Sequence, residues 1–253
     1  GSRPLTSAIL LDKARTKETL AFNKLPTSPW KLIRNTDLRK NSLDKLVKTA
    51  LKNNGLKFPI FVKPNLEGSS KGIFNDSVVS DFKSLLKITR RTIKQYSHGV
   101  LLENYLSGKE FTVGMLKNGK TWQVLPIIEV GFGELPKGIR PIDSYEVKWI
   151  YDSPEEGFDP LTCPAKIPNK LKLEIEDVCI RACEALDILD WCRIDLRLDE
   201  KGKPNIIEIN SPPGIIPDPK ENSRLPRAAR VAGISFPRLL DRFIRSARPR
   251  YKK

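Results

Sequence analysis

The most constraining feature of the sequence is a pair of short apolar segments joined by a polar turn near residue 200. "CRIDLRL" (192–198) precedes "DEKG", and "PNIIEIN" (204–210) follows it. Segments of this length between turn residues predict an antiparallel hairpin. A second hairpin is predicted at 110–128, where "KNGK" contains an Asn-Gly turn. Two hairpins among helical segments predict an α+β fold with mostly antiparallel strand pairs.

Apolar residues that recur every three to four positions distinguish the predicted helices from these strand segments. A Gly- and Pro-rich stretch at 131–147 predicts a long loop. A boundary is expected near 106–108, between a smaller first lobe and a larger second one. Helices are predicted at 6–22, 43–51, 80–96, 171–189 and 235–246, and further strands at 58–62 and 99–103.

The charge of the chain is strongly positive, with 45 Lys and Arg against 30 Asp and Glu, a net charge of +15. A solvated, Lys-rich surface is the simplest explanation, and affinity for polyanions or a phosphorylated substrate is the alternative. The tail "RFIRSARPRYKK" suggests a nucleic-acid binder, but a frayed basic end explains it more simply. Nucleic acid is therefore not expected as a partner.

The four cysteines form no C-x-x-C motif, and His98 is the only histidine. A Cys/His zinc site and a Cys/His or Ser/His/Asp nucleophile are therefore not expected. Cys179 and Cys183 lie four residues apart on a predicted helix, which favours buried free thiols. No apolar run reaches the roughly 18 residues of a membrane span, and no secretory signal opens the chain. These features predict a cytoplasmic protein without a membrane partner.

The stretch "FPIFVKPNLEGSSKGI" (58–73) has the composition of an anion site. Lys63 follows an apolar strand, so its ammonium is expected at the strand end. Glycines in the next loop let backbone N–H groups approach a ligand, and serines add hydroxyl donors. A triphosphate would suit this loop, although a plain surface turn has the same composition. The spacing excludes a G-x-x-x-x-G-K-[ST] P-loop.

Two other places combine polar groups that could bind a nucleotide. Asp195, Glu208 and Asn210 lie on the predicted late hairpin, and their oxygens suit Mg²⁺ shared with phosphates. Polar alternation on a solvent face is the alternative. "ENYLSGKE" (103–110) links two strands and could offer backbone groups to a base and a carboxylate to a ribose. An exposed hinge is the alternative there.

These three stretches, with "ILLDKARTK" and "SRLPRAARVAGISFPRLL", together resemble the D-alanine–D-alanine ligase family of ATP-grasp proteins over residues 5–246. The resemblance implies an α+β ATP-grasp fold, in which two lobes with mostly antiparallel sheets clasp ATP. It implies an ADP-forming, ATP-dependent carboxylate–amine ligase that makes a peptide bond through an acyl phosphate. The implied parts are 1–30 (remnant of an N-terminal lobe and linker helix), 31–107 (central subdomain) and 108–253 (C-terminal subdomain).

The resemblance also implies an ATP site. Lysines would contact the phosphates, a Gly/Ser loop would fold over them, and the 103–110 link would hold adenine and ribose. Two Mg²⁺ ions, or Mn²⁺, would bind at Asp195, Glu208 and Asn210. The implied ATP-binding residues are Lys13, Lys63, Glu67, Ser69, Ser70, Glu103, Tyr105, Leu106, Glu110 and Lys148.

For the ligation step, the resemblance implies an oxyanion hole made by Arg193 and the backbone N–H of Gly214. Ser69 would lie at the reacting centre, where Lys148 would reach the γ-phosphate. Ser223 would lie near the carboxylate of the acceptor amino acid, with Arg224 beside it. The substrates are expected to be small and amino-acid-like.

Four departures from the family's pattern concern the substrates rather than ATP. The chain begins at the end of the family's N-terminal lobe, so an upstream lobe or a partner is expected to complete the site. Trp149 replaces a tyrosine, the 131–145 loop is longer than usual, and Arg224 replaces an apolar residue. Substrates other than D-alanine are therefore expected. An ATP-binding module without ligase activity is the alternative, and a homodimer is a possible assembly.

Overall fold

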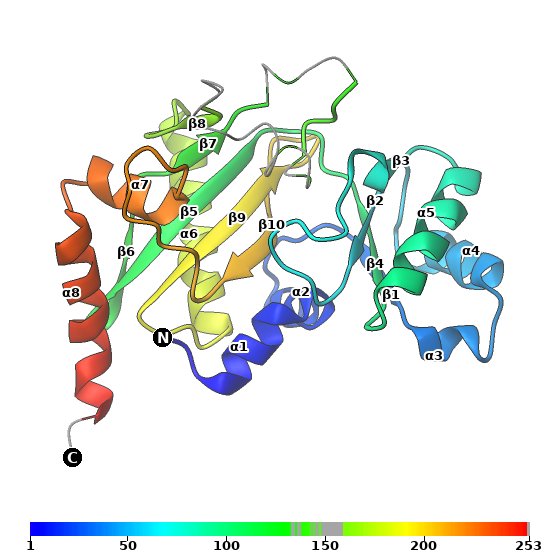
Figure 1. The fold of residues 1–253 in the computed structure, drawn as a ribbon, viewed down its shortest axis with the longest axis horizontal. Helices are drawn as coiled ribbons and strands as arrows, with labels where there is room; N and C mark the ends of the chain where they lie inside the picture. Colours follow the sequence, from blue (N-terminus) through cyan, green and yellow to red (C-terminus); the bar gives the residue numbers. More distant parts are fainter. Residues whose placement is uncertain (133–134, 136–137, 143, 145–146, 148–158, 252–253) are drawn as a thin grey trace.

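The computed structural model describes residues 1–132, 135, 138–142, 144, 147 and 159–251, and contains two antiparallel sheets (Figure 1). The smaller sheet has the order β1-β4-β2-β3. Two helices cover one face of it, and their apolar sides form its core with Val62 and Leu102. Its elements are β1 (Trp30–Ile33), β2 (Ile60–Pro64), β3 (Val78–Val79), β4 (Val100–Asn104), α3 (Asn35–Leu38), α4 (Leu43–Asn53), η1 (Asn75–Ser77) and α5 (Phe82–Gln95).

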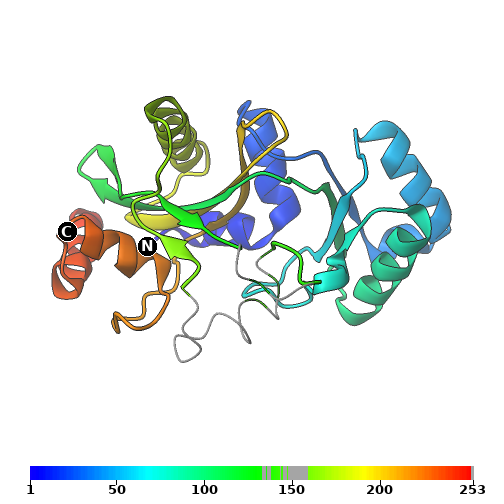
Figure 2. The same cartoon turned by 90° about the horizontal axis from the view of Figure 1, so that it is seen from above.

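The larger sheet has the order β10-β9-β5-β7-β8, and β6 pairs with β5. Helix α6 packs on one face, while α7 and α8 lie on the other (Figure 2). Gly114 on β5 lets α7 approach, because a Cβ there would lie 2.6 Å from Leu225 Cδ1. The elements are β5 (Glu110–Asn118), β6 (Thr121–Val124), β7 (Ile128–Val130), β8 (Leu161–Thr162), α6 (Asn169–Ala185), β9 (Trp191–Leu198), β10 (Pro204–Asn210), α7 (Arg224–Val231) and α8 (Phe236–Ala247).

Both predicted hairpins are present, and the turn between β5 and β6 places Gly119 at a φ of 60°. The late hairpin contains a bulge, because Ile206 pairs with Leu196 and Glu208 with Asp195. The extra residue, Ile207, lets Glu208 and Asn210 face the same side as their partners on β9. The short elements β1, β3, β8, α3 and α7 were not predicted, since pairing or packing partners from distant segments define them.

The prediction of one helix at 6–22 is wrong. The structure has two helices, α1 (Pro4–Leu11) and α2 (Lys13–Phe22), with Asp12 extended between them. The Asp12 carboxylate caps α2 by accepting from the Arg15 N–H, and it also accepts from Asn65 Nδ2 at 2.8 Å. This cap explains the break, which a periodicity argument does not reveal.

The prediction of a frayed basic C-terminus is also wrong for the described residues. The described part of the C-terminal segment ends in a 3-10 helix, η4 (Arg248–Tyr251). The Arg250 guanidinium donates to both oxygens of the Asp190 carboxylate, at 2.8 and 2.5 Å, and Ser246 Oγ donates at 2.8 Å. The Asp190 side chain is fully buried. The tail is therefore attached to the start of β9.

The four cysteines are free thiols, as the helical spacing predicts for Cys179 and Cys183. The spacing did not predict that Cys183 Sγ lies 3.6 Å from Cys192 Sγ on β9. Burial raises the pKa of the Cys179 and Cys192 thiols well above its usual value. In the described part of the chain, every helix is too short or too polar to span a membrane.

Candidate functional site

A cavity of about 370 Å³ receives residues from both sheets. Every described residue that the sequence analysis assigned to ATP, metal, catalysis or substrate lines it. Lys148 and Trp149 lie outside the described residues, as does most of the 131–158 segment; Ile142 from that segment lines the cavity. The predicted residues that line it are Lys13, Lys63, Glu67, Ser69, Ser70, Glu103, Tyr105, Leu106, Glu110, Arg193, Asp195, Glu208, Asn210, Gly214, Ser223 and Arg224.

The smaller sheet contributes a buried ionic group. Lys63 Nζ lies 2.5 Å from Glu103 Oε1, and Lys17 Nζ lies 2.8 Å from Glu103 Oε2. Phe61 is opposite Glu103 in the pairing of β2 with β4, and Lys63 lies two residues after Phe61 on β2. The side chains of Phe61, Lys63 and Glu103 therefore share the face of the sheet that lines the cavity. Burial opposes ionisation of Glu103, but the two lysines lower its pKa to about 2. Glu103 is therefore a carboxylate at neutral pH.

The loop after β2 has an unusual backbone. Ser69 and Ser70 have φ values of 53° and 59°, in the left-handed region that few non-glycine residues occupy. Such conformations cost free energy and persist only where the surrounding structure enforces them. They are common at ligand sites. At Gly72, with φ 75°, a Cβ would lie 2.5 Å from Pro64 Cγ and 2.6 Å from Tyr96 Cε2. The end of the loop is thus tightly held against β2 and α5.

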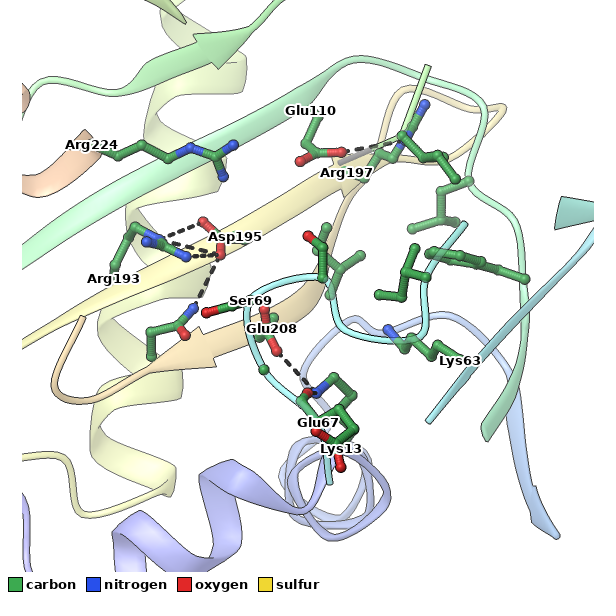
Figure 3. Close-up of a pocket in the computed structure, with 18 of the residues that line it drawn as sticks. Lys13, Lys63, Glu67, Ser69, Glu110, Arg193, Asp195, Arg197, Glu208 and Arg224 are labelled. Carbon is green, nitrogen blue, oxygen red and sulfur yellow. Dashed lines mark hydrogen bonds and ion pairs between the residues drawn. The ribbon is translucent and has the colours of Figure 1, made fainter. Parts of the chain in front are cut away.

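Lys13 connects this loop to the larger sheet (Figure 3). Its ammonium donates to the backbone carbonyl of Glu67 and lies 3.1 Å from Glu208 Oε1 on β10. The break at Asp12 makes this possible, because the Lys13 N–H donates to the Asn65 carbonyl and starts α2 beside β2. Lys13 therefore links the backbone of the loop after β2 to the Glu208 carboxylate on β10.

On the larger sheet, Asp195 is the centre of a polar cluster (Figure 3). Arg193 Nε and Nη2 donate to it at 3.0 and 2.9 Å, and Asn210 Nδ2 donates at 3.2 Å. Thr112 is opposite Asp195 in the pairing of β5 with β9, and its Oγ1 donates to the Asp195 carboxylate at 2.5 Å. Burial alone would raise the pKa of Asp195, but Arg193 and the more distant charge of Arg224 bring it below its usual value.

These residues fit a magnesium site shared with phosphate. Asp195 and Glu208 are directly opposite in the β9–β10 register, and the amide of Asn210 follows on the same face. Mg²⁺ in nucleotide sites typically takes one or two protein carboxylates together with phosphate oxygens. The described residues contain no group of three or more His, Cys, Asp and Glu side chains that could hold a metal alone. The donor set therefore suits an ion that arrives with a phosphorylated ligand.

Arg197 is a cavity residue that the sequence analysis missed. It is buried, and it donates to the Gly108 carbonyl at 3.1 Å and to Tyr105 Oη at 2.9 Å. Its Nη1 also donates to Glu110 Oε2 at 3.3 Å (Figure 3). The signal was present, because Arg197 continues the two-residue alternation of Arg193 and Asp195 along β9. Arg197 orients the side chains at the end of the cavity predicted to hold adenine and ribose.

In the 103–110 link between the two sheets, some backbone groups are already hydrogen-bonded within the protein and others remain for a ligand. The Tyr105 N–H donates to the Pro59 carbonyl at 3.0 Å, so it is already used within the protein. A contact from Tyr105 to a base would therefore use its carbonyl. Gly68, one of the two glycines that the sequence analysis expected to admit a ligand, also lines the cavity. Lining residues to which the sequence analysis gave no role are Ser28, Phe61, Ile73, Asn104, Ile142, Ile207, Ile216 and Asn222.

Residues from the C-terminal segment form the opposite end of the cavity. Ser223 Oγ accepts from the Ile216 N–H at 3.0 Å, which closes the 216–223 loop that follows Gly214. Arg224 is the first residue of α7, is 9% exposed and points into the cavity (Figure 3). Arg193 and Arg224 lie together at this end, and Arg193 is paired there with the Asp195 carboxylate.

Comparisons with known proteins agree with this arrangement. A family model described as "D-ala D-ala ligase C-terminus" matches residues 20–245. The D-alanine–D-alanine ligase of Methylococcus capsulatus is 33% identical over 240 residues, covering 95% of this chain and 67% of the relative. That of Bordetella pertussis is 30% identical and covers 93% and 66%. The chain spans about two thirds of the length of these relatives.

A solved structure of D-alanine–D-alanine ligase from Bacillus anthracis superimposes with a TM-score of 0.72 at 25% identity, covering 98% of this chain and 70% of that one. The expected α+β ATP-grasp fold is confirmed by this match. The chain therefore belongs to the D-Ala–D-Ala ligase family, in the part described as the D-ala D-ala ligase C-terminus.

Proposed function

We propose that this chain binds Mg-ATP and catalyses ATP-dependent ligation of a carboxylate to an amine, with amino-acid-like substrates. The observation that supports this most is the cavity itself. Two lysines, a Gly/Ser loop with positive φ angles, two opposed carboxylates and an arginine come from α2 and both sheets to line one space. The parts in this proposal are 1–30, 31–107 and 108–253, and the cytoplasm is the proposed location.

In the proposed nucleotide complex, Lys13 and Lys63 contact the phosphates, and Lys148 reaches the γ-phosphate. The loop from Glu67 to Gly72, with Ser69 and Ser70, covers them. The link between the sheets, with Glu103, Tyr105 and Leu106, holds adenine, and Glu110 holds the ribose. Asp195, Glu208 and Asn210 hold two Mg²⁺ ions, or Mn²⁺, whose charge neutralises phosphate oxygens.

The proposed reaction has two steps. A substrate carboxylate oxygen attacks the γ-phosphorus, the bond to the bridging oxygen of ADP breaks, and an acyl phosphate forms. The acceptor amine then attacks the acyl carbon, inorganic phosphate leaves and the amine loses a proton. Arg193 and the Gly214 N–H donate to the oxyanion that develops on the carbonyl. Ser69 is at the reacting centre, and loop closure excludes water from the acyl phosphate.

The acceptor end is proposed to involve Ser223 and Arg224. Ser223 lies beside the acceptor carboxylate. The cationic Arg224, in place of an apolar residue, favours an acceptor with an anionic or larger polar side chain over alanine.

Replacing Arg193 tests the ligase proposal. Arg193→Met in the full-length gene product is expected to lower the turnover number by 100- to 1000-fold, roughly the effect of removing one oxyanion donor. Binding of Mg-ATP is expected to change less than turnover, because Asp195 keeps its hydrogen bonds from Thr112 and Asn210 when Arg193 is removed. Release of ADP and phosphate with panels of amino acids measures turnover, and calorimetry measures binding. Arg248→Met, an exposed arginine on η4, is the control.

The same measurements also distinguish a ligase from an ATP-binding module without ligase activity. A wild-type protein that binds Mg-ATP but releases no ADP or phosphate above background with any amino acid is an ATP-binding module. A wild-type protein that does not bind Mg-ATP contradicts both proposals.

A further inference from the structure

Lys17 is a buried charge to which the proposed reaction assigns no part. It is 2% exposed and does not line the large cavity, whereas its ion-pair partner Glu103 does. Its ammonium donates to Thr27 Oγ1 at 2.7 Å and Ser28 Oγ at 3.0 Å, and lies 2.8 Å from Glu103 Oε2. An ammonium has three N–H donors, so this set uses all of them. Lys17 is thus fixed in place.

Lys63 differs from Lys17 in one respect. It pairs with the other oxygen of the same carboxylate, at 2.5 Å, but it also faces the cavity. If Lys63 binds a phosphate group, it has to weaken or leave its contact with Glu103. A buried carboxylate that loses its only cation is strongly destabilised. Glu103 does not face this loss, because Lys17 and Ser28 Oγ, at 3.3 Å, stay on its second oxygen.

From this geometry we propose that Lys17 is a positioning residue for the nucleotide site. Lys17 is the permanent counter-ion of Glu103, and Lys63 exchanges between Glu103 in the free protein and the phosphates in the nucleotide complex. Without Lys17, Glu103 would retain Lys63 and withhold it from the phosphates. This inference rests on the proposed function, since it needs an anionic ligand beside Lys63.

The local structure supports a fixed Lys17 for a second reason. Thr27 Oγ1, which accepts from Lys17, donates to the Ile206 carbonyl on β10 at 2.9 Å. Lys17 therefore connects β4 of the smaller sheet to β10 of the larger one through groups that do not face the cavity. Burial lowers the pKa of Lys17, and Glu103 opposes that effect, as expected for a buried ion pair that depends on both partners.

The test uses Lys17→Met, which removes the charge and keeps an unbranched side chain. Calorimetry with Mg-tripolyphosphate and with Mg-ATP measures the phosphate contacts with and without the base. Both ligands are expected to bind at least about tenfold more weakly, because phosphate binding would leave Glu103 without a cation. Lys17→Met/Glu103→Gln is expected to recover tripolyphosphate binding, since a neutral side chain does not retain Lys63. Lys52→Met, an exposed lysine on α4, is the control.

A purely structural role predicts a different pattern. In that case Lys17→Met lowers the melting temperature, and adding Glu103→Gln does not restore tripolyphosphate binding; that result would overturn the inference. If Lys17→Met does not fold, Glu103→Gln alone decides, because it frees Lys63 and should bind tripolyphosphate at least as tightly as wild type. Weaker binding overturns the inference. Wild type that binds neither ligand overturns the proposed function as well.

Discussion

The side chain of Arg224 enters the cavity from the first residue of α7, on the same side as Arg193 (Figure 3). Arg224→Leu is expected to lower kcat/KM for acceptors with an acidic side chain by about tenfold or more, and to favour apolar acceptors. Competing acceptors in one ligation assay measure the preference. Arg238→Leu, exposed on α8, is the control. An unchanged ranking of acceptors would exclude Arg224 from acceptor selection.

Residue-level reasoning succeeded where a side chain's chemistry is local to its own segment. Asp195, Glu208 and Asn210 could be placed on one face from the two-residue alternation of a hairpin. Lys17 could not be linked to Glu103, because these residues are 86 positions apart and meet only through the packing of α2 against the smaller sheet. The Arg193–Asp195 ion pair was also missed, because the sequence analysis gave each residue a separate role.

At the scale of elements, the loop after β2 depends on Gly72. Gly72→Ala is expected to lower the free energy of unfolding by about 2–3 kcal/mol, since the new Cβ meets Pro64 and Tyr96 and φ is positive. It should also weaken Mg-ATP binding by displacing Ser69 and Ser70. Urea denaturation and calorimetry measure the two effects.

Gly119→Ala is a matched control for the cost of placing alanine at a positive φ. Gly119 also has a positive φ, 60°, but no atom lies within 4 Å of an added Cβ. Gly119→Ala should lower the free energy of unfolding by only about 1 kcal/mol and leave nucleotide binding unchanged. Equal losses for the two variants would show that contacts at Gly72 are unimportant.

Long elements with strong periodicity were predicted from the sequence, as in α5 and the two hairpins. The break between α1 and α2 was not, although Asp12 is a good capping residue. A cap forms only if the chain leaves the helix there, and the bond from Asn65 stabilises that exit. The short strand β1 likewise exists because it pairs with β4.

At the scale of the whole molecule, stability at acid pH should depend on Glu103. Its pKa of about 2 in the folded chain lies below its ordinary value of 4.5. The carboxylate therefore stabilises the fold fully above about pH 4.5, and this contribution, on the order of 3 kcal/mol, is lost as the pH falls toward 2. Denaturant titrations at several pH values measure it.

The control for this pH dependence removes the titrating group. Glu103→Gln should flatten the change in unfolding free energy between about pH 4.5 and 2, whereas Glu200→Gln, an exposed change in the β9–β10 turn, should not. A Glu103→Gln protein with the wild-type slope would show that other groups cause the acid sensitivity.

The sequence by itself determined the α+β fold class, because hairpins and amphipathic helices are encoded within short segments, and its resemblance to the D-alanine–D-alanine ligase family named most of the cavity residues. The tertiary structure decided which charges meet. Lys17 and Lys63 share Glu103, Arg193 pairs with Asp195, and Lys13 joins the loop to β10. The reason is physical: the energy of an ion pair depends on distance and burial, and both arise only when the two sheets, distant in sequence, pack around one cavity.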